Sequence, residues 1–181
     1  MKLLRTRGFT LVELVVVILI IGILGAAAYG RFASTPTFEA RAFGDQVAAL
    51  IRYAKRTAIA QNRNVYVVFN ANYVALCFDP ACASSNMVIS PGNSGNSATR
   101  TYCLDGGNYK GNWACEGKPG SVTMSTSPAA ATFYVDALAK PFASTDPSGS
   151  SSSSFSGLTI TLNGGDHTST VVVEAETAYV H

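Results

Sequence analysis

Residues 9–28 read FTLVELVVVILIIGILGAAA, a run of twenty residues whose only charged side chain belongs to Glu13. In a helix, twenty residues rise about 30 Å, which matches the hydrocarbon core of a bilayer. Three basic residues, Lys2, Arg5 and Arg7, precede the run. Because basic residues mark the cytoplasmic side of a membrane segment, we expect the N-terminus in the cytoplasm and the bulk of the chain on the other side.

Three interpretations of this segment are open. A secretory signal peptide could be cleaved after Ala28, but its apolar region is ordinarily about 7–15 residues long and contains no acid. An uncleaved membrane anchor fits the length, yet it gives no reason for Glu13, whose burial at a helix centre costs roughly 2.5–3.5 kcal/mol. The third interpretation depends on the resemblance of residues 1–13 to a known family.

The amino-acid composition and net charge limit the kinds of molecule that the chain could bind. The chain has 181 residues, which fits one domain with appendages, and a net charge of +2. Without residues 1–8, which hold three of the 13 basic groups, 10 basic and 11 acidic groups remain. Such a near-neutral chain has no global field to attract nucleic acid. A local basic patch is the exception: Arg52, Lys55, Arg56 and Arg63.

The four cysteines lie in the middle third of the chain: Cys77, Cys82, Cys103 and Cys115. An even number of cysteines behind an export-like segment indicates disulfides formed in an oxidising compartment, and free buried thiols are the alternative. Asp79-Pro80 favours a turn between the first two cysteines. Of the three possible pairings we therefore prefer Cys77–Cys82 with Cys103–Cys115.

After the apolar run, we expect an amphipathic helix over residues 30–62. Its apolar residues recur at the spacing of one helical face: Phe43, Val47, Leu50, Ile51, Ala54 and Ala58. Pro36 lacks a backbone N–H donor, so it is expected to kink or interrupt the helix near its start.

Residues 63–181 are predicted to form a β-rich head. Runs of β-branched and aromatic residues between turn signals predict strands at 65–69, 73–78, 122–124, 132–135, 158–162 and 170–174. Residues 144–157, STDPSGSSSSSFSG, predict a flexible surface loop. The fold class is therefore α+β: a long N-terminal helix, with a membrane half at 9–29 and an amphipathic half at 30–62, packed on an antiparallel sheet.

No pattern of catalytic or metal-binding residues is present in the sequence. It lacks G-x-S-x-G, the Walker A motif, H-E-x-x-H and the calcium loop. The cysteines do not have zinc-ligand spacing, and both histidines, His167 and His181, lie far downstream. We therefore expect no enzyme activity, no cofactor and no metal. Tyr102, Tyr109 and Trp113 could stack on a sugar or a partner if exposed, or pack beneath a disulfide loop.

The N-terminus MKLLRTRGFTLVE resembles the class III signal of type IV pilins and type II secretion pseudopilins. The shared features are a basic leader, Gly8 before Phe9, Glu13 four residues later and a long apolar helix. The sequence departs from many major pilins at Gly30, where they carry a proline. The resemblance implies that prepilin peptidase cuts between Gly8 and Phe9 and methylates Phe9.

This resemblance also suggests a role for the acid. Residues 1–8 become a cytoplasmic leader, and residues 9–29 become a transmembrane and filament-core helix. Cleavage creates an amine on Phe9, and Glu13 of one subunit would pair with the amine of a neighbour. A charge in lipid is costly alone and strongly attracted to an opposite charge. In the alternative interpretation, Glu13 only snorkels to the interface.

A second resemblance concerns the head. A helix containing Ala40-Arg41 and the run from Ala49 to Ile59, feeding directly into a β-hairpin, is similar to the H-type group of minor pilins and pseudopilins. It implies a minor pilin that is incorporated into, or primes, a type IV pilus, with a plan similar to minor pilins of the mannose-sensitive haemagglutinin pilus.

The implied partners are other pilins or pseudopilins, prepilin peptidase, the inner-membrane assembly platform and the membrane itself. The implied location is a single pass of the bacterial inner membrane with a periplasmic C-terminal domain, and then a filament.

Three alternatives stay open: a minor pseudopilin of a type II secretion system, a tip module that binds carbohydrate or DNA, and a soluble periplasmic protein cleaved after Ala28. Nucleic acid is not favoured, because the C-terminal VVVEAETAYVH holds Glu174 and Glu176 and no Lys or Arg.

Overall fold

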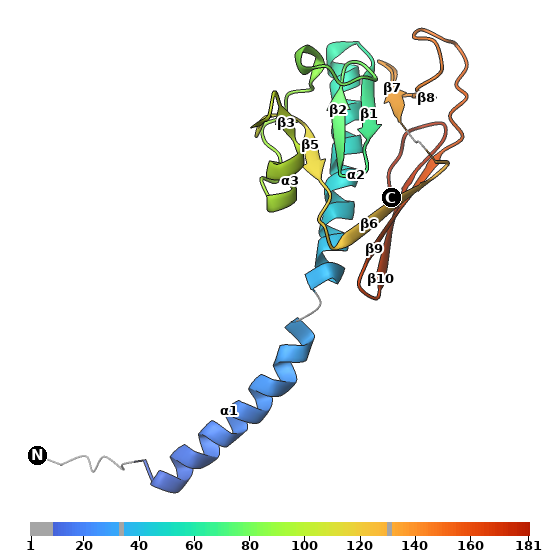
Figure 1. Cartoon of the computed structure of the whole chain (residues 1–181). Helices are drawn as coiled ribbons and strands as arrows, with labels where there is room; N and C mark the ends of the chain where they lie inside the picture. The colour runs from blue at the N-terminus through green and yellow to red at the C-terminus, as the bar shows by residue number, and fades with distance from the viewer. Residues whose placement is uncertain (1–8, 33–34, 130–131) are drawn as a thin grey trace, which may run out of the picture. The chain divides into compact units, whose positions relative to one another are not determined.

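The computed structural model describes residues 9–32, 35–129 and 132–181 (Figure 1). The backbone divides into two compact units, Met1–Thr35 and Pro36–His181. The first contains α1 (Leu11–Phe32), and the second contains nearly all of α2 (Thr35–Gln61) together with the strands.

Helix α2 supplies the apolar face on which the head is built. Pro36 stands in its first turn, where a missing N–H donor is tolerated. The predicted face is confirmed, because all six of its residues are buried: Phe43, Val47, Leu50, Ile51, Ala54 and Ala58. The helix ends at Gln61, and Asn62 follows in the left-handed region with φ of 49°. Asparagine is among the few residues that adopt this conformation at a helix C-terminus.

A five-stranded antiparallel sheet packs on α2. In spatial order its strands are β5 (Cys115–Gly117), β2 (Tyr73–Cys77), β1 (Val65–Phe69), β7 (Phe133–Val135) and β8 (Pro141–Ala143). Side chains of a strand alternate between its two faces. Val65 and Val67 of β1 accordingly join the core cluster with α2, whereas Tyr66 packs with Tyr134 and Phe142 in an outer cluster.

Two smaller sheets and two short helices complete the head. A three-stranded antiparallel sheet has the order β10 (His167–Val173), β9 (Leu158–Gly164) and β6 (Val122–Ser127). A two-stranded sheet joins β3 (Leu104–Asp105) to β4 (Asn108–Tyr109). The short helices are η1 (Ser84–Asn86) and α3 (Ser97–Tyr102), and α3 lies beside β5 in Figure 1.

The α+β class is confirmed, but the head contains two larger sheets where the sequence predicted one. The length of α2 explains the difference. Its 27 residues rise about 40 Å, whereas a strand of five residues spans about 17 Å. The three-stranded sheet therefore packs near the start of α2, where a Cβ added to Gly164 would lie 2.2 Å from the carbonyl oxygen of Pro36. Only glycine allows the backbones to come this close.

The serine-rich segment 144–157 lies largely at the surface, as predicted, and is tied to the five-stranded sheet. The Asp146 carboxylate accepts hydrogen bonds from the Ala143 N–H at 3.1 Å, the Ser154 N–H at 2.9 Å and the Ser154 hydroxyl at 2.6 Å. The ring of Phe155 packs on that of Phe133, with centroids 4.9 Å apart. Serine content alone predicted none of these contacts, because they depend on side chains at both ends of the segment.

We expect Phe43→Ala to lower the free energy of unfolding by about 3–5 kcal/mol, because it opens a cavity in the core. Phe43 is 1% exposed, whereas Phe38, on the same helix, is 63% exposed. Phe38→Ala is therefore the matched control and should change the free energy by less than about 0.5 kcal/mol. Urea unfolding followed by the fluorescence of Trp113, the only tryptophan of the chain, measures both. Equal destabilisation by the two changes would contradict the assigned core.

The stability of the head should depend on pH through Asp146. Hydrogen bonds from the hydroxyl and the backbone N–H of Ser154 hold the pKa of the Asp146 carboxyl below its ordinary value of 3.8. Because the pKa is lower in the folded state, the stabilisation by Asp146 is complete above about pH 4 and is lost as the pH falls through the folded-state pKa.

We therefore expect Asp146→Asn to be less stable than the unsubstituted chain at about pH 6, and the difference to shrink below about pH 4. Urea unfolding at a series of pH values measures the difference. Asp45→Asn, on the exposed side of α2, controls for the loss of one negative charge. A stability difference that stays constant down to about pH 2 would show that the Asp146 carboxylate does not act in this way.

Candidate functional site

The predicted processing and assembly residues lie at the start of α1. Gly8 falls outside the described residues. Phe9 precedes the helix and is 71% exposed. Glu13 stands in the first turn of α1, and its side chain is exposed. The structure thus places Phe9 and Glu13 at one exposed helix end, where both are accessible.

Thr10 is a residue at this end that the sequence reasoning missed. The Glu13 N–H donates to the Thr10 hydroxyl oxygen at 3.2 Å, so Thr10 caps the helix that begins at Leu11. The signal was present as Thr10-Leu-Val-Glu13, the spacing of a capping box. An acid in the first turn is also favoured by the positive end of the helix dipole. Glu13 therefore has a local stabilising role in addition to the predicted pairing role.

The apolar side chains of α1 between Leu11 and Leu24 are exposed on every side of the helix. In the stretch Val15–Ile18, which covers a full turn, the exposed fraction of the side chains runs from 39% to 59%. A helix that is hydrophobic on every side normally lies in a protein interior or a membrane. Of the helices in the described ranges, none meets the combined length and apolarity needed for a membrane span.

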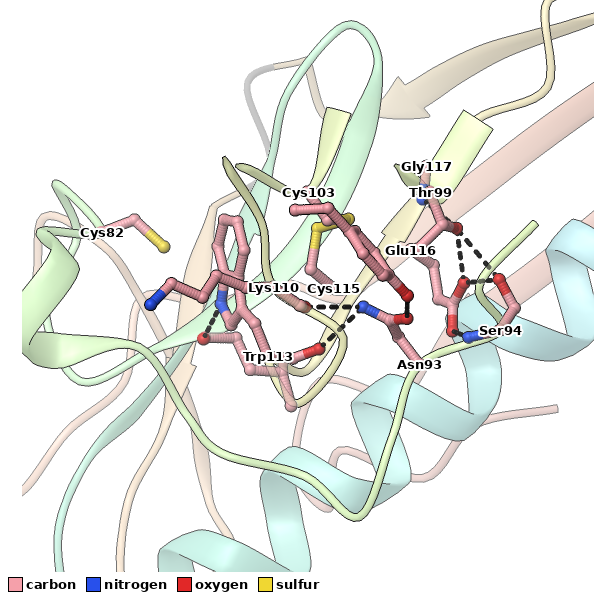
Figure 2. Close-up of a disulfide and its surroundings, with 12 residues drawn as sticks. Cys82, Asn93, Ser94, Thr99, Cys103, Lys110, Trp113, Cys115, Glu116 and Gly117 are labelled. Carbon is pink, nitrogen blue, oxygen red and sulfur yellow. Dashed lines mark hydrogen bonds between the residues drawn. A yellow bond between two sulfur atoms is a disulfide. The ribbon is translucent and has the colours of Figure 1, made fainter. Parts of the chain in front are cut away.

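In the head, the structure joins Cys77 to Cys82. It also joins Cys103 to Cys115, and Figure 2 shows this second disulfide. The first disulfide closes a short loop after β2. The second links the end of α3 to β5 and belongs to a small buried cluster with Ala75 and Trp113. The indole N–H of Trp113 donates to the carbonyl oxygen of Leu76 at 3.1 Å, which connects this cluster to β2.

A buried carboxylate organises the segment that leads into α3. Glu116, 7% exposed, accepts hydrogen bonds from the N–H and hydroxyl of Ser94 and from the hydroxyl of Thr99 (Figure 2). Thr99 in turn accepts from the Gly117 N–H at 3.0 Å. Buried charges are tolerated when hydrogen bonds replace their lost hydration. This set resembles a serine beside a base, but each member is used to hold the fold.

Helix α3 is seated directly on β5. A Cβ added to Gly117 would lie 2.3 Å from the carbonyl carbon of Ala98, so this strand position requires glycine. The side chain of Asn96 caps α3 by accepting from the Thr99 N–H at 2.8 Å. These contacts give the surface between α2 and α3 a defined shape.

The three aromatic residues singled out in the sequence have different environments. Trp113 is 3% exposed, so it is not part of a stacking surface. The Tyr109 hydroxyl donates to the Asn93 side-chain oxygen, and the Tyr109 ring lies beneath the Arg100 guanidinium. Tyr102 is 37% exposed and lines a cavity. Only Tyr102 is therefore placed to meet a ligand, and the idea of an exposed cluster of three rings is wrong.

The basic residues of α2 serve largely to hold the chain's end. The Arg52 guanidinium donates to the carbonyl oxygen of Val180 at 3.1 Å, and the Lys55 ammonium donates to that of Thr177 at 2.8 Å. Arg63 lies over the Phe78 ring at 3.6 Å.

No cluster of three or more His, Cys, Asp or Glu suited to a metal ion occurs within residues 9–32, 35–129 and 132–181.

Comparison with known proteins identifies a motif in the N-terminal segment. Residues 3–29 match the model of the prokaryotic N-terminal methylation motif. Over 61 residues the chain is 43% identical to PilA5 of Thermus thermophilus, described as the major component of a type IV narrow pilus. That similarity covers 34% of this chain and 53% of PilA5, so the chain spans about half the length of this relative.

Among solved structures, the type IV minor pilin FimU of Pseudomonas aeruginosa is similar in two crystal forms. The first covers 80% of this chain and 87% of FimU at 10% identity with a TM-score of 0.48. The second covers 78% and 90% at 9% identity with a TM-score of 0.45.

The motif at residues 3–29 contains both Phe9 and Glu13, and the N-terminal helix leads into a helix packed on antiparallel sheets. Residues 3–29 therefore carry the prokaryotic N-terminal methylation motif, and part of the chain is similar to a component of a type IV pilus.

Proposed function

We propose that this protein is a structural subunit of a type IV pilus, assembled with other pilins through α1. Two observations carry the proposal. Residues 3–29 match the methylation motif, and the apolar side chains of α1 between Leu11 and Leu24 are exposed on every side of the helix. Exposed apolar surface of this extent is removed from water by packing against similar helices. The head has its own core around α2 and does not need α1 for that purpose.

Processing comes first in this proposal. Prepilin peptidase cuts between Gly8 and Phe9, removes residues 1–8 and methylates Phe9. Phe9 is exposed and precedes the first helical residue, which suits it as a substrate of an enzyme that acts on extended chain. The new amine on Phe9 carries the positive charge that the next step requires.

Glu13 then sets the axial register between subunits. The segment 9–29 holds the subunit in the inner membrane as a single pass with the head in the periplasm, until the assembly platform moves it into the filament. A lone carboxylate at low dielectric is costly, and the amine of a neighbouring Phe9 is the opposite charge that relieves this cost. The exposed position of Glu13 at the end of α1 leaves its side chain free to reach another chain.

We further propose a minor rather than a major subunit, of the H-type group. Its support is the direct passage from α2 into the β1–β2 hairpin, in which Val67 pairs with Leu76 and Phe69 with Val74. A plan like that of minor pilins of the mannose-sensitive haemagglutinin pilus agrees with this arrangement. A minor pseudopilin of a type II secretion system is the competing assignment, since it would use the same α1 chemistry.

We expect Glu13→Gln to be processed normally but to be depleted at least about tenfold from sheared filaments, because it leaves the neighbouring amine without its partner charge. The variant is expressed in a host with a type IV pilus system, and the filament and membrane fractions are compared by immunoblot. Mass spectrometry of the membrane fraction should show an N-terminal methyl-Phe9 in both proteins. Asp45→Asn, which removes one acid from α2, serves as the matched control and should enter filaments normally.

Two results would count against the proposal. Filament levels of Glu13→Gln equal to those of the unsubstituted chain would remove the pairing role of Glu13. A protein that retains residues 1–8 in the filament would remove the processing step as well. Recovery of the chain only with a secretion apparatus, and not with pili, would support the pseudopilin assignment.

A further inference from the structure

The two larger sheets of the head end in the edge strands β5 and β8 in one sheet and β6 and β10 in the other (Figure 1). An edge strand presents unpaired backbone N–H and C=O groups, so proteins usually shorten it, cover it or place Lys or Pro on it. Helix α3 covers β5, whose Gly117 lies against the backbone of that helix. Strand β8 has three residues, starts at Pro141 and follows Lys140. Val172 of β10 and His181 exchange two backbone hydrogen bonds, at 2.8 and 3.1 Å. These three edges are therefore protected.

Strand β6 differs from the other edge strands. It has six residues, VTMSTS, with no charged side chain and no proline. On one side it pairs with β9 along its whole length, from Val122 opposite Gly164 to Ser127 opposite Thr159. On the other side, no strand of the described part of the chain pairs with it. The edge of β6 therefore has none of the usual protection against pairing with another chain.

The hydrogen bonds at the start of β6 show which backbone groups face away from β9. The Val122 N–H donates to the Pro119 carbonyl oxygen at 3.1 Å rather than to β9. In an antiparallel pair, residues that bond to the partner strand alternate with residues that face away from it. Met124 and Thr126 therefore face away from β9, as Val122 does. Within the described residues, their N–H and C=O groups have no backbone partner.

The side chains of β6 also indicate an open edge. Met124 and Thr126 are partly exposed, although they lie on the same face of the strand as Val122, which is 1% exposed. Opposite them on β9, Leu162 and Ile160 are both 0% exposed. Because backbone groups without a partner are rarely buried, the N–H and C=O groups of Met124 and Thr126 must be accessible to water.

A positive charge stands at the start of this edge. The Lys118 ammonium donates to the Val122 carbonyl oxygen at 2.8 Å, on the side that faces away from β9. Among the described residues, no carboxylate lies within ion-pair distance of Lys118. A strand that pairs antiparallel with β6 runs from Ser127 towards Val122, so its C-terminal end would arrive beside this ammonium.

We propose that β6 accepts the extended C-terminal segment of another protein as an additional antiparallel strand. Strand addition of this kind gains its affinity from main-chain hydrogen bonds. The segment would bond to the N–H and C=O groups of Met124 and Thr126, and its terminal carboxylate would pair with the Lys118 ammonium. The β6 strand of a second copy brings no carboxylate to Lys118, which favours a different chain as the partner. This binding function goes beyond the structural role and does not depend on α1.

The test uses the full-length chain in detergent micelles and a probe peptide, acetyl-Gly-Ser-Thr-Val-Thr-Val with a free C-terminal carboxylate. Calorimetry measures the affinity, and amide hydrogen exchange followed by NMR locates the peptide. Without peptide, the Met124 and Thr126 amides should exchange faster than those of Thr123 and Ser125, which face β9. Saturating peptide should slow exchange at Met124 and Thr126 by about tenfold or more. The same peptide with an amidated C-terminus should bind about three- to fivefold more weakly, because a partly exposed ion pair contributes little.

Thr126→Pro tests the backbone of the edge. Proline removes the N–H that faces away from β9, and an edge strand tolerates this because no hydrogen bond to β9 is lost. The variant should stay folded, as its melting temperature would show, and should bind the peptide about tenfold more weakly or worse. Thr126→Ala is the matched control, because it removes the same side chain and keeps the N–H. It should bind normally.

Lys118→Met tests the charge. This variant should bind the acid and the amidated peptide equally, with the affinity that the unsubstituted chain has for the amidated form. Lys110→Met is the matched control, since Lys110 pairs with Asp105 elsewhere in the head. It should still prefer the peptide with the free carboxylate.

Several outcomes would overturn the proposal. These are the absence of saturable peptide binding, equal binding by Thr126→Pro and Thr126→Ala, and equal affinity of the unsubstituted chain for the acid and amidated peptides. Slow exchange of the Met124 and Thr126 amides in the free chain at every protein concentration would show that the edge is covered. Protection that increases with protein concentration in the absence of peptide would assign the edge to a second copy.

Discussion

The burial of the apolar face of α2 is the interaction on which the rest of the head depends. That face runs from Phe43 to Ala58, and the core cluster that contains it also takes residues from β1, β2, β7, β9 and β10. Burial of a side chain of this kind stabilises the fold by roughly 1.5–3 kcal/mol, so a full face outweighs the contribution of any single polar contact in the loops. Because α2 is longer than one strand, two sheets pack along it. One of these sheets contains β1 and β2, and the other consists of β6, β9 and β10.

The cysteine-containing half of the head is held by a different kind of interaction. Residues 78–121 bury few large apolar side chains, and their order comes from two disulfides and from the hydrogen bonds of Glu116 and Asn93. A buried carboxylate must have all its partners in place, since each missing hydrogen bond costs free energy. These contacts hold the region in place even though it is made largely of loops.

The helices α1 and α2 differ in how their apolar side chains are distributed. Between Leu11 and Leu24, apolar side chains cover all sides of α1, which suits contact with lipid or with other helices. Helix α2 instead has one apolar and one polar face, as is usual for a helix at a protein surface. An assembly role for α1 therefore leaves the head free to carry a second function.

The sequence by itself determined the pilin-like N-terminus, the buried face of α2, the positions of most strands and the α+β class, because these depend on local periodicity and on short motifs such as Gly8-Phe9 with Glu13. It also contained the Thr10–Glu13 cap, which was overlooked. Only the tertiary structure decided that Trp113 is buried while Tyr102 is exposed, that the strands form two larger sheets, and that Gln46 lacks a partner. These properties arise from contacts between residues far apart in the chain, such as Gly164 with Pro36 and Gly117 with Ala98, and local patterns carry no information about such contacts.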